Sequence, residues 1–132
     1  MNNKSRIYIA GHTGMVGSAL QKRMILDGFK NITTMTRNKL NLLDQKKTRD
    51  FIEEVKPEIV ILLAGKVGGI LANTKYPADF IYENLTIQNN IIYSSLEMNV
   101  KTLIFLGSSC IYPRNCQQPM KENMLLSGKL EK

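Results

Sequence analysis

The chain has 132 residues, 43% of them hydrophobic, and a formal net charge of +7 at neutral pH. This length fits one globular domain, and the longest apolar run, residues 59–65, has the length of a strand, well short of the ~20 residues of a membrane-spanning helix. A polar stretch opens the chain in place of a secretory signal, so we expect a cytoplasmic protein that does not contact a membrane.

Cysteine content and the placement of charge exclude further classes of protein. Cys110 and Cys116 have neither the spacing of a zinc site nor that of a redox pair, so we expect reduced thiols and no bound metal. Residues 1–49 contain ten Lys or Arg and two Asp, an excess that would attract an anionic cofactor, although solvated lysines on helix faces explain most of it. The basic residues are neither interleaved with aromatic residues nor confined to one helix, so no nucleic-acid partner is expected.

Strand and helix patterns alternate along the chain. Short apolar runs predict four strands, while helical spacing and cap residues, among them Asp44 as an N-cap, predict three helices. Gly28 is placed to end the first helix in a left-handed conformation, and the last helix takes its spacing from Ile81, Leu85, Ile92 and Leu96. The strands are expected at residues 6–10, 32–36, 59–64 and 102–106, and the helices at residues 15–27, 44–55 and 78–99.

This alternation predicts an α/β fold, a Rossmann-type doubly wound parallel sheet that is truncated after about four strands. Residues 107–132 contain no strand or long helix, and a structureless stretch of that length is uncommon in a compact domain. The fourth strand would also leave an apolar edge open to water. We therefore expect the chain to be the front portion of a longer protein.

Three glycines spaced three residues apart follow the first strand. Gly11 lets the chain turn sharply, Gly14 lets the backbone approach a pyrophosphate, and Gly17 lets the helix pack closely. The amides of the first helical turn would then hold the phosphates of a dinucleotide. A glycine-rich turn without a ligand is the alternative. The expected cofactor contacts are Gly11, His12, Thr13, Gly14, Met15, Val16 and Gly17.

The residue that ends the second strand favours NADP over NAD. NAD-binding sites usually place an Asp or Glu about 20 residues after the glycine turn, whereas this chain has Arg37, whose guanidinium suits a 2′-phosphate. Lys39 could add a second charge, although a solvated lysine is the better account of this residue. Asp44 could accept a hydrogen bond from the adenine amino group, with helix capping as the alternative role.

Polar residues follow the fourth strand, in the stretch F-L-G-S-S-C-I-Y-P. In a doubly wound sheet the ligand lies beyond the carboxyl ends of the strands, where the strand order reverses, and we expect the first and fourth strands to flank that point. Ser108, Ser109 and Cys110 would then lie near the nicotinamide ring. A simple polar turn before Pro113 is the other interpretation.

Several motifs together resemble the GDP-L-fucose synthase family of the extended short-chain dehydrogenase/reductase superfamily. These motifs are I-A-G-H-T-G-M-V-G-S-A-L, L-N-L-L-D, K-V-G-G-I, Y-P-A-D-F-I-Y-E-N and F-L-G-S-S-C-I-Y-P, and the resemblance covers nearly the whole chain. It implies an enzyme that epimerises GDP-4-keto-6-deoxy-D-mannose at C3 and C5 and reduces its 4-keto group with NADPH, giving GDP-L-fucose. It also implies a GDP-sugar substrate and makes a homodimer plausible for the full-length protein.

The resemblance also implies roles for individual residues. Ser108 matches a serine that hydrogen-bonds the substrate carbonyl, and Cys110 matches a cysteine that acts as acid and base in epimerisation. The nicotinamide side would be lined by Leu106, Gly107, Ser108 and Ser109. Some members of the family carry a basic residue where this chain has Thr13, which leaves one phosphate contact without a counterpart.

The proton-donating Tyr-x-x-x-Lys of the superfamily is missing, because none of the five tyrosines has a lysine four residues later. Residues 1–132 would therefore form the N-terminal part of an NADP-binding Rossmann domain without a sugar-nucleotide domain, completed by a C-terminal polypeptide. A non-catalytic dinucleotide-binding module or split-enzyme partner is one alternative. Another nucleotide-sugar epimerase or reductase of the superfamily is the second.

Overall fold

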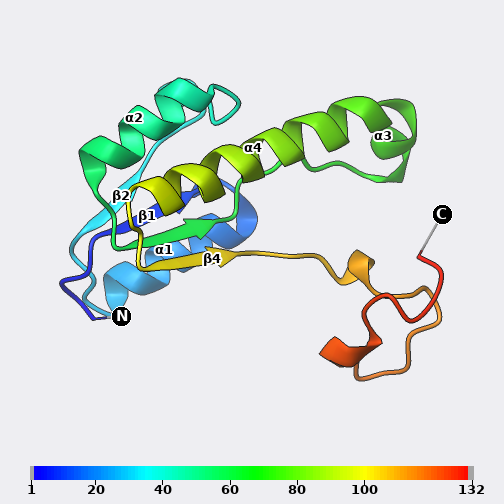
Figure 1. The fold of residues 1–132 in the computed structure, drawn as a ribbon. Coiled ribbons are helices and arrows are strands. Elements are labelled where there is room, and N and C mark those ends of the chain that lie inside the picture. Colours follow the sequence, from blue (N-terminus) through cyan, green and yellow to red (C-terminus); the bar gives the residue numbers. More distant parts are fainter. Residues whose placement is uncertain (1, 131–132) are drawn as a thin grey trace.

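The computed structural model describes residues 2–130 and contains a four-stranded parallel sheet between two layers of helices (Figure 1). Every neighbouring pair of strands is parallel, in the order β2-β1-β3-β4. The strands are β1 (Ile7–Ala10), β2 (Ile32–Thr34), β3 (Ile59–Leu62) and β4 (Thr102–Phe105). The helices are α1 (Met15–Leu26), α2 (Gln45–Val55), α3 (Ile70–Lys75) and α4 (Pro77–Glu97).

The faces that the helices cover determine the order of the strands. α1 covers one face of the sheet, while α2 and α4 pack together on the other (Figure 1). Because crossovers between parallel strands are right-handed, a helix on one face leads the chain in one direction and a helix on the other face leads it back. The predicted doubly wound sheet is thus confirmed, with its reversal between β1 and β3.

The prediction that the first and fourth strands flank this reversal is wrong. β3 lies between them and pairs with β1 on one side and with β4 on the other. β3, which follows α2, pairs with the edge of β1 that β2 leaves free. No edge of β1 then remains for β4, which pairs with β3 instead. The carboxyl end of β4 is consequently one strand away from the reversal point.

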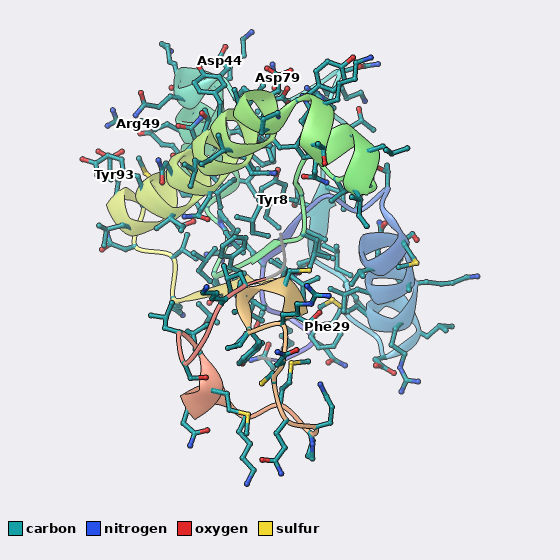
Figure 2. The ribbon with its side chains drawn as sticks, turned by 90° about the vertical axis from the view of Figure 1, so that its right-hand side faces the viewer. Tyr8, Phe29, Asp44, Arg49, Asp79 and Tyr93 are labelled. Carbon is teal, nitrogen blue, oxygen red and sulfur yellow. The ribbon has the colours of Figure 1, made fainter. Side chains whose placement is uncertain are left out.

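Alternate residues of the two central strands supply two hydrophobic cores. Tyr8 and Val60 point toward α2 and α4, where the Tyr8 ring meets the edge of Phe51 at 4.8 Å between centroids. Ile9 and Ile61 point toward Met24 of α1. Figure 2 shows Tyr8 in the interior beneath α4. Continuous apolar strands that are buried on both faces are typical of a parallel sheet.

Two helix ends follow from the sequence as expected. Gly28 adopts φ +85° after α1, and the amides of Gly28 and Phe29 bond to the carbonyls of Ile25 and Met24, each at 3.0 Å. Asp44 caps α2, because its Oδ1 accepts a hydrogen bond from the Lys47 backbone N–H at 3.0 Å.

The structure departs from the expected boundaries after β3. A short helix, α3, lies between β3 and α4, where no helix is predicted, and α4 begins at Pro77 and ends at Glu97, two residues before the expected end. Between residues 107 and 130 the chain forms only the short 3-10 turns Ser109–Ile111 and Glu122–Met124, as the lack of strand and helix patterns predicts.

The outer face of α4 is apolar, and its inner face is partly polar. The residues that predicted its helical spacing, Ile81, Leu85, Ile92 and Leu96, all lie on the exposed side, whereas Asn90, Ser94 and Ser95 are buried. β4 likewise leaves Ile104 and Phe105 about half exposed at the sheet edge, as expected. Among residues 2–130 no helix combines the length and the apolar content needed to cross a bilayer.

The cap of α2 generates a pH-dependent prediction. The hydrogen bond from the Lys47 backbone, more than the charge of Lys47, holds the pKa of the Asp44 carboxyl below its usual range. A carboxyl with a lowered folded-state pKa stabilises the protein above its unfolded-state pKa, and this contribution disappears as the pH falls through the folded-state value. Asp44→Ala should therefore lower the urea midpoint at pH 7, and the difference from wild type should shrink in strong acid, where the protonated carboxyl keeps only the weaker bond of a neutral oxygen.

Asp44→Asn is the matched control, because asparagine keeps a capping oxygen but carries no charge. It should retain most of the midpoint at pH 7 without the acid dependence. Identical urea midpoints for wild type and Asp44→Ala at pH 7 would contradict the capping role.

Candidate cofactor-binding site

A cavity of about 450 Å³ opens where the strand order reverses, at the carboxyl ends of β1 and β3. Its walls come from the glycine turn, the segments that follow β2 and β3, and the inner face of α4, with Leu106 after β4. Ligands of doubly wound sheets bind at this position, and the volume is within the usual range for small-molecule sites. Tyr8 also lines the cavity, and burial raises the pKa of its phenol, so this side chain is neutral.

The glycine turn approaches the end of β3 so closely that side chains are excluded. Gly11 has φ +91°, and a Cβ there would lie 2.6 Å from the Ala64 backbone nitrogen. A Cβ on Gly17 would lie 2.1 Å from the Gly11 carbonyl oxygen, so this glycine serves the contact between α1 and the turn that precedes it. Gly14 is different, since a Cβ there would meet only the Gly11 oxygen, at 3.4 Å.

The beginning of α1 fits a diphosphate. Gly14 is an extended N-cap without a capping side chain, and the first helical hydrogen bond runs from Ser18 N–H to the Gly14 carbonyl at 2.9 Å. The amides of Met15, Val16 and Gly17 therefore precede the helical hydrogen-bond ladder, and the first turn carries no acidic residue. Such amides, in the positive field of a helix N-terminus, bind phosphate groups.

Arg37 lines the cavity from the segment that follows β2. Its side chain is 74% exposed, and its Nη2 lies 3.4 Å from Glu83 Oε2. Lys39, by contrast, is absent from the cavity wall. Residues 40–43, the L-N-L-L segment, are held by α4, because Asn90 Nδ2 donates a 2.8 Å hydrogen bond to the Leu42 carbonyl. This buried hydrogen bond positions the L-N-L-L segment in the cavity wall.

The sequence-predicted residues divide into two groups. The cavity brings together Gly11, Thr13, Gly14, Met15, Val16, Gly17, Arg37 and Leu106. His12, Asp44, Gly107, Ser108, Ser109 and Cys110 do not line it. Asp44 uses its carboxylate to cap α2, and among the described residues the buried Nδ1 of His12 has no hydrogen-bond partner.

Ser108 and Cys110 occupy an exposed turn beyond β4, where the chain leaves the sheet (Figure 1). Ser108 Oγ accepts a hydrogen bond from the Cys110 backbone N–H at 3.2 Å, and Cys110 has a free, exposed thiol. Their distance from the cavity follows from the position of β4 at the edge of the sheet. Their expected role beside the nicotinamide stays a prediction.

Sequence reasoning did not identify the segment after β3 as part of the site. Lys66 lines the cavity, and its Nζ pairs with Glu83 Oε1. Asn84 holds the Lys66 backbone from both sides, since its Oδ1 accepts from the Lys66 N–H at 2.7 Å and its Nδ2 donates to the Lys66 carbonyl at 3.0 Å. The only sequence signal for Lys66 was its position shortly after the carboxyl end of a buried strand, where ligands of a parallel sheet bind.

A family model and several known proteins match nearly the whole chain. The model of the NAD dependent epimerase/dehydratase family matches residues 7–132. GDP-L-fucose synthase of Escherichia coli is 50% identical over 129 residues, which are 98% of this chain and 40% of that protein. GDP-L-fucose synthase 1 of Arabidopsis thaliana is also 50% identical, over 99% of this chain and 41% of its own length. The chain thus spans about 40% of the length of these curated relatives.

A solved structure also resembles the chain. MlghC, a GDP-mannoheptose C4 reductase from Campylobacter jejuni with NADP bound, has a TM-score of 0.93 at 47% identity. The match covers 99% of this chain and 41% of that one. Since the family model covers nearly all of the sequence, the chain belongs to the NAD dependent epimerase/dehydratase family.

Proposed function

We propose that this chain is the NADP-binding part of a GDP-sugar epimerase/reductase that converts GDP-4-keto-6-deoxy-D-mannose to GDP-L-fucose with NADPH. The observation that carries the proposal is the 50% identity to two GDP-L-fucose synthases along almost the whole chain. The cavity between the glycine turn and Arg37 supports its cofactor half.

The chain's own residues account for dinucleotide binding. The amides of Met15, Val16 and Gly17 hold the diphosphate, and the guanidinium of Arg37 pairs with the 2′-phosphate. The apolar side chains of Met35 and Ile87, which line the cavity together with residues 40–43, would exclude water from the adenosine end. The bound coenzyme would supply the hydride for reduction of the 4-keto group.

The proton chemistry belongs to the turn after β4. Protons next to a ketone are acidic, so the Cys110 thiolate would remove and return them at C3 and C5 of the sugar. The Ser108 hydroxyl accepts from the backbone in this structure, which leaves its own hydrogen free to bond the substrate carbonyl oxygen. That hydrogen bond would stabilise the negative charge that develops there.

The sugar-nucleotide-binding part is proposed to lie outside residues 1–132, since the chain spans about 40% of its curated relatives. None of its tyrosines precedes a lysine by four positions, so the Tyr-x-x-x-Lys pair would come from the same region or from a separate polypeptide. A homodimer of the complete protein forms part of this proposal.

Two alternatives to this function are each supported by one observation. The 47% identity to a GDP-mannoheptose C4 reductase favours another GDP-sugar as a second candidate substrate. The exposure of Ser108 and Cys110 outside the cavity favours a module that binds a dinucleotide without catalysing a reaction.

Replacing Arg37 tests the coenzyme preference. Arg37→Met should weaken NADPH binding about tenfold to a hundredfold, the usual size of a hydrogen bond to a charged group, and leave NADH binding nearly unchanged. Fluorescence titration of the reduced nicotinamide measures both affinities. Lys39→Met is the matched control and should bind as wild type does, because Lys39 is not part of the cavity wall. Equal losses of NADPH and NADH affinity would refute the 2′-phosphate contact.

A chimeric enzyme tests the reaction itself. Residues 1–132 replace the corresponding segment of the E. coli GDP-L-fucose synthase, and the product is identified by NMR in D₂O. We expect GDP-L-fucose with deuterium at C3 and C5. Cys110→Ser should lose deuterium incorporation but keep NADPH binding, whereas the control Cys116→Ser, whose thiol contacts Met124, should retain both.

The failures of this experiment are informative. A folded chimera that binds NADPH without turnover would support the non-catalytic module. Reduction of a GDP-heptose in preference to the deoxymannose substrate would support the C4 reductase alternative.

A further inference from the structure

A carboxylate in the wall of the cavity contacts two cationic side chains that also line it. Glu83 of α4 contacts Lys66 Nζ with Oε1 and lies 3.4 Å from Arg37 Nη2 with Oε2. All three side chains line the cavity. Glu83 therefore bridges the segment after β2 and the segment after β3 across the site.

The contact with Lys66 is held firmly. Lys66 is tied through its backbone to Asn84, and its ammonium lies 5.4 Å from the centroid of the Phe80 ring. Phe80, Glu83 and Asn84 are spaced three and four residues apart, so they share one face of α4. The hydrogen bond from Lys66 is the main cause that keeps the pKa of Glu83 below its usual range, so the carboxylate is charged at neutral pH.

The contact between Glu83 and Arg37 is the weaker of the two. The Arg37 side chain is 74% exposed, against 19% for Glu83 and 28% for Lys66. At 3.4 Å the hydrogen bond is long. Arg37 is thus the member that can change its partner, while Glu83 stays in place.

From this geometry we propose that Glu83 is an internal counter-ion that competes with the coenzyme's 2′-phosphate for Arg37, and thereby lowers the preference for NADPH over NADH. The inference rests on the proposed NADP binding. A 2′-phosphate must draw the guanidinium away from Glu83, whose charge stays paired with Lys66. NADH has a hydroxyl at that position, so it does not compete for Arg37.

The test is a double-mutant cycle on the full 132-residue chain. Glutamine keeps the size of Glu83 and an acceptor for Lys66 but removes the charge. Glu83→Gln should tighten NADPH binding about two- to fivefold, the range measured for partly exposed ion pairs, and change NADH binding less than twofold. In the Arg37→Met background the same substitution should leave NADPH affinity unchanged, because the guanidinium for which Glu83 and the 2′-phosphate compete is absent.

Glu97→Gln is the matched control. Glu97 lies on the same helix and pairs with Arg49 at 3.3 Å, away from the cavity, so its substitution should alter neither affinity.

A measurement on the wild type removes the dependence on variant folding. The ¹³C signal of the Glu83 carboxylate should shift on addition of NADPH and stay in place with NADH.

The outcomes separate this inference from the proposed function. Weaker or equal NADPH binding by Glu83→Gln, a gain that persists without Arg37, or a carboxylate signal that responds alike to both coenzymes would overturn the counter-ion role while NADP binding stands. A wild-type chain that binds neither coenzyme would overturn the proposed cofactor site, and this inference with it.

Discussion

The close approach of the glycine turn to the end of β3 is the constraint on which the site depends. A side chain at Gly11 would collide with the Ala64 backbone, and one at Gly17 would collide with the Gly11 carbonyl. Because both positions lack a Cβ, α1 begins directly at the reversal of strand order, with its first amides beside the cavity. Backbone geometry places the positive end of the helix where an anionic ligand of a doubly wound sheet binds.

The inner face of α4 organises the rest of the cavity with polar contacts. Asn84 holds the segment after β3 and Asn90 holds the segment after β2, so one helix fixes both loops that face the glycine turn. Amides that are buried, as Asn90 is, or partly buried, as Asn84 is, are costly unless they are paired, and these pairings make the loop positions specific. Several large apolar side chains of α4, including Ile81 and Leu96, lie instead on its outer side.

The sequence predicted much of the fold and only part of the site. Alternating patterns, the glycine turn, the left-handed Gly28 and the Asp44 cap are local features, and the structure contains each of them. Strand order depends on which face each helix covers, so the neighbour of β1 was predicted wrongly. Lys66 and Glu83 are 17 residues apart and meet only through the tertiary packing of α4, which no local pattern reveals. Ser108 and Cys110 were identified by their position after the fourth strand and given roles by resemblance, and their place beside a substrate depends on parts of the site outside the cavity.

Amide chemical shifts measured during an NADPH titration test the central claim most directly. The claim is that the first amides of α1 hold the coenzyme's diphosphate. In ¹H–¹⁵N spectra of the uniformly labelled chain, the largest shifts should fall on Met15, Val16 and Gly17, and inorganic pyrophosphate should move the same signals to a smaller extent. Saturation with NADPH that leaves these three amides unmoved, while signals elsewhere shift, would contradict the account.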